Sequence, residues 1–177
     1  MKNKRFDRWL QLKDKLDEFE KRMPLYLKPL IFMPAAEEKD FPRIYYKDEK
    51  AAVTAINFRL AKLLLHAALR ENLQVVDQSR VEIEMKNYPR NFTENLAREV
   101  AGIMASYDSD MRIWPINIHS LRQASQFVDS SSPCFKTLRN LTIRVISVCQ
   151  TNSNIPDLLN EKENGPKAAT TGTFVET

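Results

Sequence analysis

The side chains of this sequence that could take part in catalysis or hold a metal ion are few and far apart. His66 and His119 lie 53 positions from one another, and neither has a carboxylate at helical spacing. The only cysteines, Cys134 and Cys149, are too few for a zinc site or a disulfide framework. Both lie in or beside an apolar helical pattern, so we expect buried thiols in a reducing compartment. The sequence predicts no catalytic residue, no metal site and no enzyme.

Two further kinds of site are also not expected. Glu82 and Glu84 would share one face of an extended segment, but a solvated loop explains them better. There are only three glycines, and no G-x-G or G-K-[ST] motif that could hold a phosphate. We therefore expect no cofactor.

The net charge is +4, and within residues 1–28 nine Lys/Arg alternate with five Asp/Glu. Interleaved signs are typical of a solvated helix face, so no DNA-binding residue is predicted.

The elements that could position functional residues begin with an amphipathic helix at about residues 4–23. Its apolar residues follow steps of three and four: Phe6, Trp9, Leu12, Leu16, Phe19 and Met23. Pro24 ends it. The stretch "PLYLKPLIFMP" contains three prolines and predicts an extended apolar strap. Phe41 is expected to pack onto the domain after the strap, Tyr45 and Tyr46 could form a short extended piece, and Asp48 offers a helix N-cap.

Residues 51–73 form the most apolar part of the chain, with fourteen apolar residues among the nineteen from 51 to 69. Arg59, Lys62, His66 and Arg70 form one polar stripe on a helical wheel. A charge at the middle of a bilayer costs roughly 2.5–3.5 kcal/mol on the lenient scale, which argues against a membrane span. The pattern predicts a helix enclosed by other helices, with its basic stripe facing water. Asn57 should then point into the core and bond to a neighbouring element.

Three more helices follow after a connection at residues 74–90, which has at most one short turn around Val81 to Met85. The first is capped by Asn91 with Glu94 in a capping box, the second has Pro115 in its first turn, and the third begins at Pro133 after a Ser132 cap. No strands long enough for a sheet are expected. The sequence predicts an all-α fold, an irregular multi-helix bundle or array of about five main helices. Residues 1–150 would form this domain, and residues 151–177 a disordered tail.

Large apolar side chains and one buried amide are the best candidates for a core or a pocket wall. Trp9 and Trp114 are the main anchors, and either could pack in the core or line a ligand pocket. Phe19, Phe41 and Asn57 complete the set of candidate core or pocket-wall residues.

The order of these segments resembles the C-terminal regulatory region of fungal zinc-cluster transcription factors. In that family a tryptophan-led helix runs into a proline-bearing strap that ends in Pro-Leu. The matching positions here are Trp9, Phe19, Pro24, Pro29 and Leu30.

The resemblance continues through a Phe-Pro-x-Ile segment that starts at Phe41 and precedes the Ala/Leu-rich helix. "NLAREVAGIMAS" and "IWPINIHSLRQASQFV" are similar to the family's next two helices, so the resemblance spans about residues 9–149. The six-cysteine cluster of the family's DNA-binding module is missing, Phe19 stands where tryptophan is frequent, and Gln123-Ala124-Ser125 replaces a frequent Ala-Gly pair.

The resemblance implies a truncated relative that acts in transcriptional regulation through protein contacts, with no direct nucleic acid. No membrane partner is expected either, because of the charges in the middle of the apolar helix. The partners of such a relative would be the transcription machinery or a zinc-cluster factor, and a small effector is left open. It implies a nuclear location, with the cytoplasm as the other option. A second hypothesis stays beside it: a small-molecule-binding helical protein outside transcription, with an apolar pocket between the long helix and the proline strap.

Overall fold

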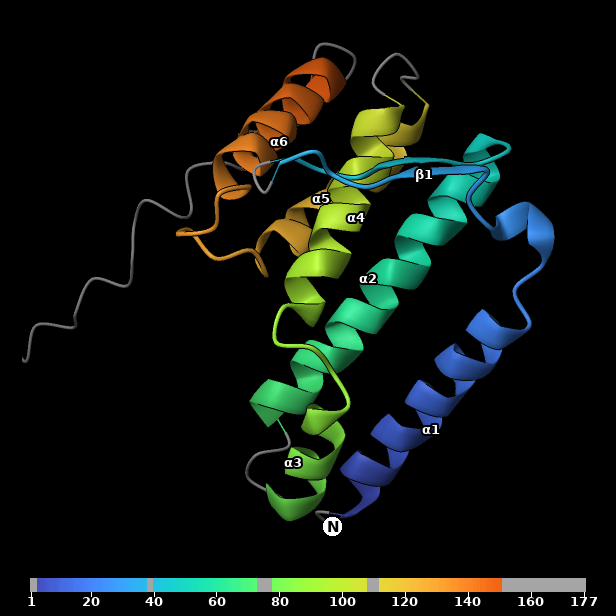
Figure 1. Cartoon of the computed structure of the whole chain (residues 1–177), viewed down its shortest axis with the longest axis vertical. Coiled ribbons are helices and arrows are strands. Elements are labelled where there is room, and N and C mark those ends of the chain that lie inside the picture. Colours follow the sequence, from blue (N-terminus) through green and yellow to red (C-terminus); the bar gives the residue numbers. More distant parts are fainter. Residues whose placement is uncertain (1–2, 38–39, 73–77, 108–111, 151–177) are drawn as a thin grey trace, which may run out of the picture.

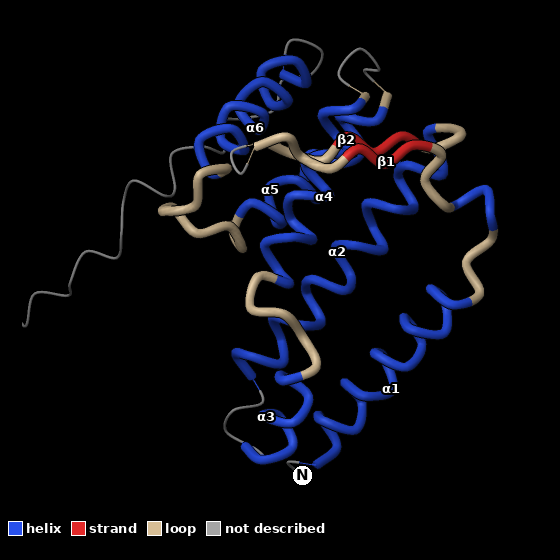
Figure 2. Tube along the Cα trace, in the orientation of Figure 1, coloured by secondary structure: helices blue, strands red, loops and turns tan. Residues whose placement is uncertain are grey.

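A computed structural model describes residues 3–37, 40–72, 78–107 and 112–150 of the chain. The expected all-α fold is confirmed, because α-helices dominate and only one small two-stranded sheet accompanies them (Figure 2). The elements in chain order are α1 (Asn3–Lys21), η1 (Leu25–Leu27), β1 (Ile31–Met33), β2 (Arg43–Tyr45), α2 (Glu49–Asn72), α3 (Gln78–Lys86), α4 (Phe92–Ser106), α5 (Ile113–Ser125) and α6 (Phe135–Gln150). The expected tail, residues 151–177, lies outside the described residues.

Helix α2 is the central element of the described structure. It contacts α1 on one side, and α4 and α5 on the other (Figure 1). Asp48 caps it as expected, because its Oδ1 accepts a hydrogen bond of 2.8 Å from the Ala51 amide. By length and composition alone, residues Glu49–Leu69 could cross a membrane, and 44% of the most apolar window is buried in the structure. The absence of a membrane partner therefore stays a prediction.

The apolar side chains form two separate clusters. The larger one joins α2, α4, α5, α6 and strand β2, with Ile56, Leu63, Val100 and Trp114 among its fully buried residues. The smaller one lies where α1 and α3 meet α2. It consists of Phe6, Trp9, Leu69 and Val81, with Leu10, Leu65 and Met85 packed against them. The two predicted tryptophan anchors thus belong to different clusters.

Helix α3 is a correction to the expected connection. The segment forms a nine-residue helix rather than a single turn. It has few apolar residues, so its periodicity is weak. Val81 and Met85, four positions apart, supply the side that packs against the smaller cluster. Helical stability here comes from that packing more than from local propensity.

Two of the expected helix caps are wrong in detail. The Asn91 side chain makes no capping hydrogen bond at the start of α4. The Glu94 carboxylate, expected to complete the capping box, instead accepts a hydrogen bond of 2.6 Å from the Ser132 hydroxyl. Ser132 therefore ties the loop before α6 to α4, and α6 begins at Phe135 rather than at Pro133. The charge-assisted hydrogen bond between Ser132 and Glu94, which are 38 positions apart, therefore takes the place of the two local caps.

The strap and the short extended piece pair into a hairpin that crosses one end of the helical array (Figure 1). β1 and β2 are antiparallel, with Phe32 opposite Ile44. β2 docks on α4, where Gly102 makes the close approach possible. A Cβ at Gly102 would lie 2.1 Å from the Pro42 carbonyl oxygen. The glycine therefore allows the backbone before β2 to lie directly against the helix.

Candidate functional site

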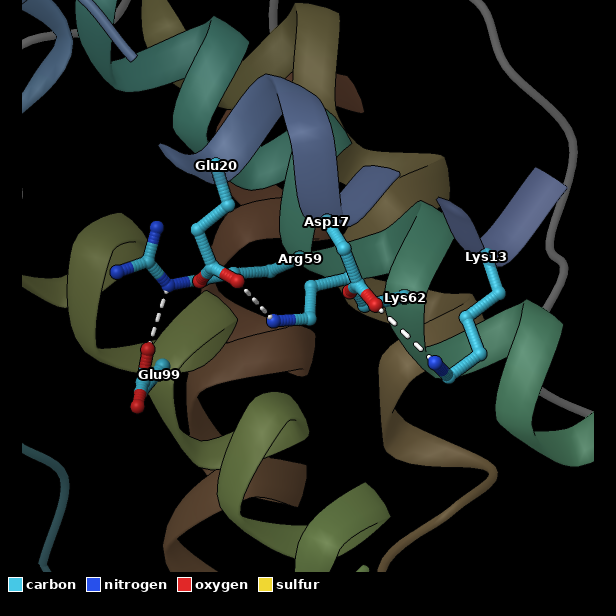
Figure 3. A network of polar contacts seen from close by, with 6 residues as sticks. All are labelled: Lys13, Asp17, Glu20, Arg59, Lys62 and Glu99. Carbon is cyan, nitrogen blue, oxygen red and sulfur yellow. Dashed lines mark hydrogen bonds and ion pairs between the residues drawn. The ribbon is translucent and has the colours of Figure 1, made fainter. Parts of the chain in front are cut away.

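The basic stripe of α2 is covered, although it was expected to face water. The Arg59 Nε donates a hydrogen bond of 2.6 Å to Glu99 of α4, and the Arg59 side chain is only 15% exposed. The Lys62 Nζ lies 2.9 Å from the Glu20 carboxylate of α1. Figure 3 shows the two pairs, with the Glu20 carboxylate coming from α1 and the Glu99 carboxylate from α4. His66, next along the stripe, is 5% exposed. From Arg59 to His66, the part whose side chains are described, the stripe is therefore a helix–helix contact.

The face of α2 that does reach solvent carries Asn57 and Leu64. Asn57 is exposed, so the expectation that it points into the core and bonds across it is wrong. Leu64, seven positions later on the same face, is 40% exposed. A helical wheel fixes which residues share a face but not which face is covered. The basic stripe is the covered face because Glu20 of α1 and Glu99 of α4 pair with its cations.

A small cavity opens beside His66, between α1, α2 and the turn before α4. Its volume is about 280 Å³, and Lys13, Asp17 and Lys62 line it together with an aromatic group. The rings of His66, Tyr88 and Phe92 pack mutually, with centroids 4.7 Å, 5.1 Å and 4.7 Å apart. The size fits only a small molecule.

The charges at this cavity are already balanced. Lys13 lies 3.2 Å from Asp17, and Lys62 is paired with Glu20. Burial alone would lower the pKa of Lys13, but the hydrogen bond and charge of Asp17 outweigh it and raise that pKa. Burial raises the pKa of Tyr88. At neutral pH the Lys13 side chain at the cavity is therefore an ammonium and the Tyr88 side chain a neutral phenol, and both can donate a hydrogen bond to a bound molecule.

A second, larger recess lies at the end of the strap. It has a volume of about 480 Å³ and is lined by Met33, Phe41 and Pro42 with Ala105 of α4 and Thr137 of α6. The lining is mainly apolar. The second hypothesis placed an apolar pocket between the strap and the long helix α2. The recess lies instead between the strap and α4 and α6.

The five candidate residues do not form one site. Trp9 is 4% exposed, and its Nε1 donates to the Leu65 carbonyl at 2.7 Å. Trp114 is 1% exposed and donates to the Met104 carbonyl at 3.0 Å. Both indoles therefore have their polar atom satisfied inside a core cluster.

The remaining candidates are less buried. Phe19 is 40% exposed and packs against Phe58 with ring centroids 5.3 Å apart. Phe41 is half-buried and lines the strap recess. Asn57, as described above, faces solvent. Phe19 therefore lies against α2 at the residue next to Asn57, whereas Phe41 lines the recess between the strap, α4 and α6.

The most unusual surface of the described chain was not singled out from the sequence. Six large apolar side chains within nine residues are exposed: Leu25 82%, Tyr26 57%, Leu30 67%, Ile31 51%, Phe32 51% and Met33 43%. We call this set the apolar strap surface. A run of exposed large apolar side chains is a candidate interaction site in a soluble protein. The three prolines within this apolar stretch were the sequence feature that could have predicted its exposure. Prolines prevent a long helix here, so the apolar side chains cannot line up on one buried helix face.

Metal and thiol chemistry find little support in the described residues. No group of three His, Cys, Asp or Glu side chains among them is placed to hold a metal ion. Cys134 and Cys149 are both buried and not disulfide-bonded, as expected. The Cys134 Sγ lies 3.3 Å from the Ser132 hydroxyl and 3.7 Å from Glu94, so it belongs to the contact that fixes the loop before α6.

Comparisons of the chain with protein-family models, with curated proteins and with solved structures find no match. The similarity to the regulatory region of fungal zinc-cluster factors therefore stays a prediction, together with the nuclear location that it implies.

Proposed function

We propose that the chain is a non-catalytic helical interaction domain that acts in transcriptional regulation by binding a protein partner. The observation that carries the proposal is the apolar strap surface, held out on a hairpin by a well-packed helical scaffold. The partner would belong to the transcription machinery or be a zinc-cluster factor, with the nucleus as the site of action. No direct contact with nucleic acid is part of the proposal.

The build of the scaffold supports this role. The hairpin is anchored to α4 through Ile44, whose amide donates to the Ser106 hydroxyl at 2.9 Å, and through Tyr46, whose amide donates to the Tyr107 hydroxyl at 2.7 Å. Ile44 itself is fully buried. The strap is thus fixed on one side while its apolar side chains stay in water. Ordering this surface in advance lowers the entropic cost of binding a partner.

A tethering assay tests the proposal. The full chain, residues 1–177, is fused to an unrelated DNA-binding module, and a reporter gene is measured in a fungal host against the module alone. We expect the fusion to change reporter output, and Leu30→Ser to abolish the change. Ile116→Ser is the matched control, because Ile116 on α5 is 66% exposed and Leu30 is 67% exposed. Reporter output equal to that of the module alone, with equal nuclear levels of both proteins, refutes the proposal.

The apolar recess at the strap favours a second candidate function, binding of a small apolar molecule outside transcription. The recess has a volume of about 480 Å³, within the range of small-molecule sites. A polarity-sensitive dye should then bind saturably, and Phe41→Ala should weaken the binding. Saturable dye binding with no reporter effect would favour this second function over the first.

A further inference from the structure

The hairpin has one closed edge and one open edge. On the closed edge, the Ile44 amide of β2 donates to the hydroxyl of Ser106, the last residue of α4. The Tyr46 amide donates to the hydroxyl of Tyr107, the C-cap of α4, and that hydroxyl donates back to the Tyr46 carbonyl at 3.1 Å. Side chains of α4 therefore replace a third strand on this side. The outer side of β1 has no such cover in the described chain, and all three residues of β1 are exposed.

The direction of the Ile44 amide determines which backbone groups of β1 point toward the open edge. Ile44 lies opposite Phe32, and its amide points away from β1 toward α4. In an antiparallel ladder this makes Phe32 and Ile44 a non-hydrogen-bonded pair. The Phe32 N–H and C=O therefore point outward, toward the open edge. They form a donor and acceptor ready for one residue of an added strand.

The open edge of β1 offers few free backbone groups. Two residues after Phe32 lies Pro34, which has no N–H. Two residues before it, the Leu30 amide is already used by the Tyr45 carbonyl at 2.8 Å. An edge limited in this way discourages open-ended pairing between copies. It fits a short extended segment that makes one reciprocal pair of backbone bonds and gains the rest of its affinity from side chains.

The charge around the edge indicates the chemistry of that segment. Lys28, Arg43 and Lys47 are exposed, and none of the ion pairs found among the described residues includes them. Carboxylates near this edge are mostly used within the fold. Glu20 is paired with Lys62 and Glu49 with Arg112. Asp48 caps α2 through the Ala51 amide, whereas Asp40 lines the strap recess beside Arg43. Among the described residues at the border of the apolar strap surface, the three exposed cations outnumber the two carboxylates, Glu37 and Asp40, that neither cap a helix nor pair with a cation in the ion pairs above. A partner with acidic side chains would complement this surface.

We propose that β1 binds a short, extended, acidic segment of a partner protein, in which apolar residues alternate with Asp or Glu. The segment adds a third strand beside β1, pairs its backbone with Phe32, buries its apolar side chains on the strap, and places its carboxylates near Lys28 and Arg43. This inference rests on the proposed function, since it names the chemistry of the partner. A lipid surface would meet the cations and apolar groups, but lipid tails leave the Phe32 N–H and C=O without partners.

The test uses the full chain and two synthetic peptides. In one, Glu alternates with Val; in the other, Lys replaces each Glu. We expect the Glu peptide to bind saturably, to perturb the backbone NMR signals of Phe32, and to bind at least about tenfold more tightly than the Lys peptide at low salt. The double variant Lys28→Glu with Arg43→Glu should reverse this preference. The control is Lys4→Glu with Arg5→Glu, which changes the net charge equally on exposed residues of α1.

A backbone test separates strand addition from charge alone. Phe32→Pro and Phe32→Ala both remove the ring, but only the proline removes the outward N–H. We expect Phe32→Pro to bind the Glu peptide more weakly than Phe32→Ala, with helical circular dichroism unchanged in both. The charge-reversal variants keep the test decisive if the proline disturbs the hairpin.

Several results would overturn the inference. They are no saturable binding of the Glu peptide, no reversal of preference in the double variant, or binding of anionic phospholipid vesicles in place of the peptide. A reporter effect in the tethering assay combined with any of these would leave the interaction function in place and remove only strand addition at β1.

Discussion

Replacing Gly102 by alanine tests whether strand β2 is seated on α4 as described. Gly102 is buried in the middle of α4, where alanine would ordinarily stabilise a helix by roughly 1 kcal/mol. The added Cβ, however, would lie 2.1 Å from the Pro42 carbonyl oxygen and 3.2 Å from both its carbonyl carbon and its Cγ. The nearest atom is backbone, so it cannot move aside by a change of rotamer.

The magnitude follows from the displacement that the methyl group requires. Ordinary contact begins at about 3.4 Å, so the backbone at Pro42 must move by about 1 Å. Overpacking of this kind costs about 1–3 kcal/mol. The shift also stretches the hydrogen bond from the Ile44 amide to Ser106, which is worth about 1 kcal/mol. These terms exceed the propensity gain, and we expect Gly102→Ala to lower the free energy of unfolding by about 1–3 kcal/mol.

Urea denaturation followed by circular dichroism at 222 nm measures the change. For a chain of this length each kcal/mol corresponds to about 2–4 °C in Tm, so a thermal melt gives a second reading. Asn95→Ala is the control, since Asn95 lies on the exposed side of α4 and its replacement changes helix propensity alone. A Gly102→Ala variant as stable as the wild type, or more stable, would show that Pro42 does not lie against the helix.

Three further predictions concern polar contacts inside the fold. Tyr107→Phe removes the hydroxyl that bonds both the amide and the carbonyl of Tyr46, and should cost about 1–3 kcal/mol in urea denaturation. A double-mutant cycle with Arg59→Met and Glu99→Gln should give a coupling of about 1 kcal/mol, because the pair is mostly shielded from solvent; zero coupling would place it in water. Burial raises the pKa of Tyr88, so the folded chain favours the neutral phenol. The free energy of unfolding should then fall as pH rises past about 10, and Tyr88→Phe should flatten that fall.

The helices that carry a strong apolar period could be predicted from the sequence, and α3 could not. The run around Ile56 and Leu63, and the face of α4 through Leu96 and Val100, repeat at three and four positions and are buried as the pattern indicates. Helix α3 has only Val81 and Met85 facing the fold. A nine-residue helix is marginal in isolation, so its existence depends on a cluster built by distant segments, which no local pattern encodes.

The candidate site was predictable only in part, for the same reason. Burial of Trp9 follows from its place in the periodic face of α1, and the indole proton finds a carbonyl on α2. The exposure of Asn57 could not be read from a wheel, since the wheel contains no information about Glu20 and Glu99, which lie 37 positions before and 42 positions after it. The strap residues were recognised as apolar and extended, but their exposure follows from the closed edge of the hairpin.

The ion pairs of the covered stripe also help to fix how α1 and α4 pack around the apolar helix α2. Its two midpoint cations each have a carboxylate from a different neighbour, Glu99 on α4 for Arg59 and Glu20 on α1 for Lys62. Breaking a largely shielded pair leaves an uncompensated charge, which costs more than the pair itself contributes. Among the described residues, α1 contacts α2 through the small cluster, the Phe19–Phe58 ring contact and the Lys62–Glu20 pair, whereas α4 and α5 share the large core with α2. The charges on α2 therefore favour one arrangement in which both neighbours are docked, and in that arrangement the chain leads from the end of α1 directly into the strap.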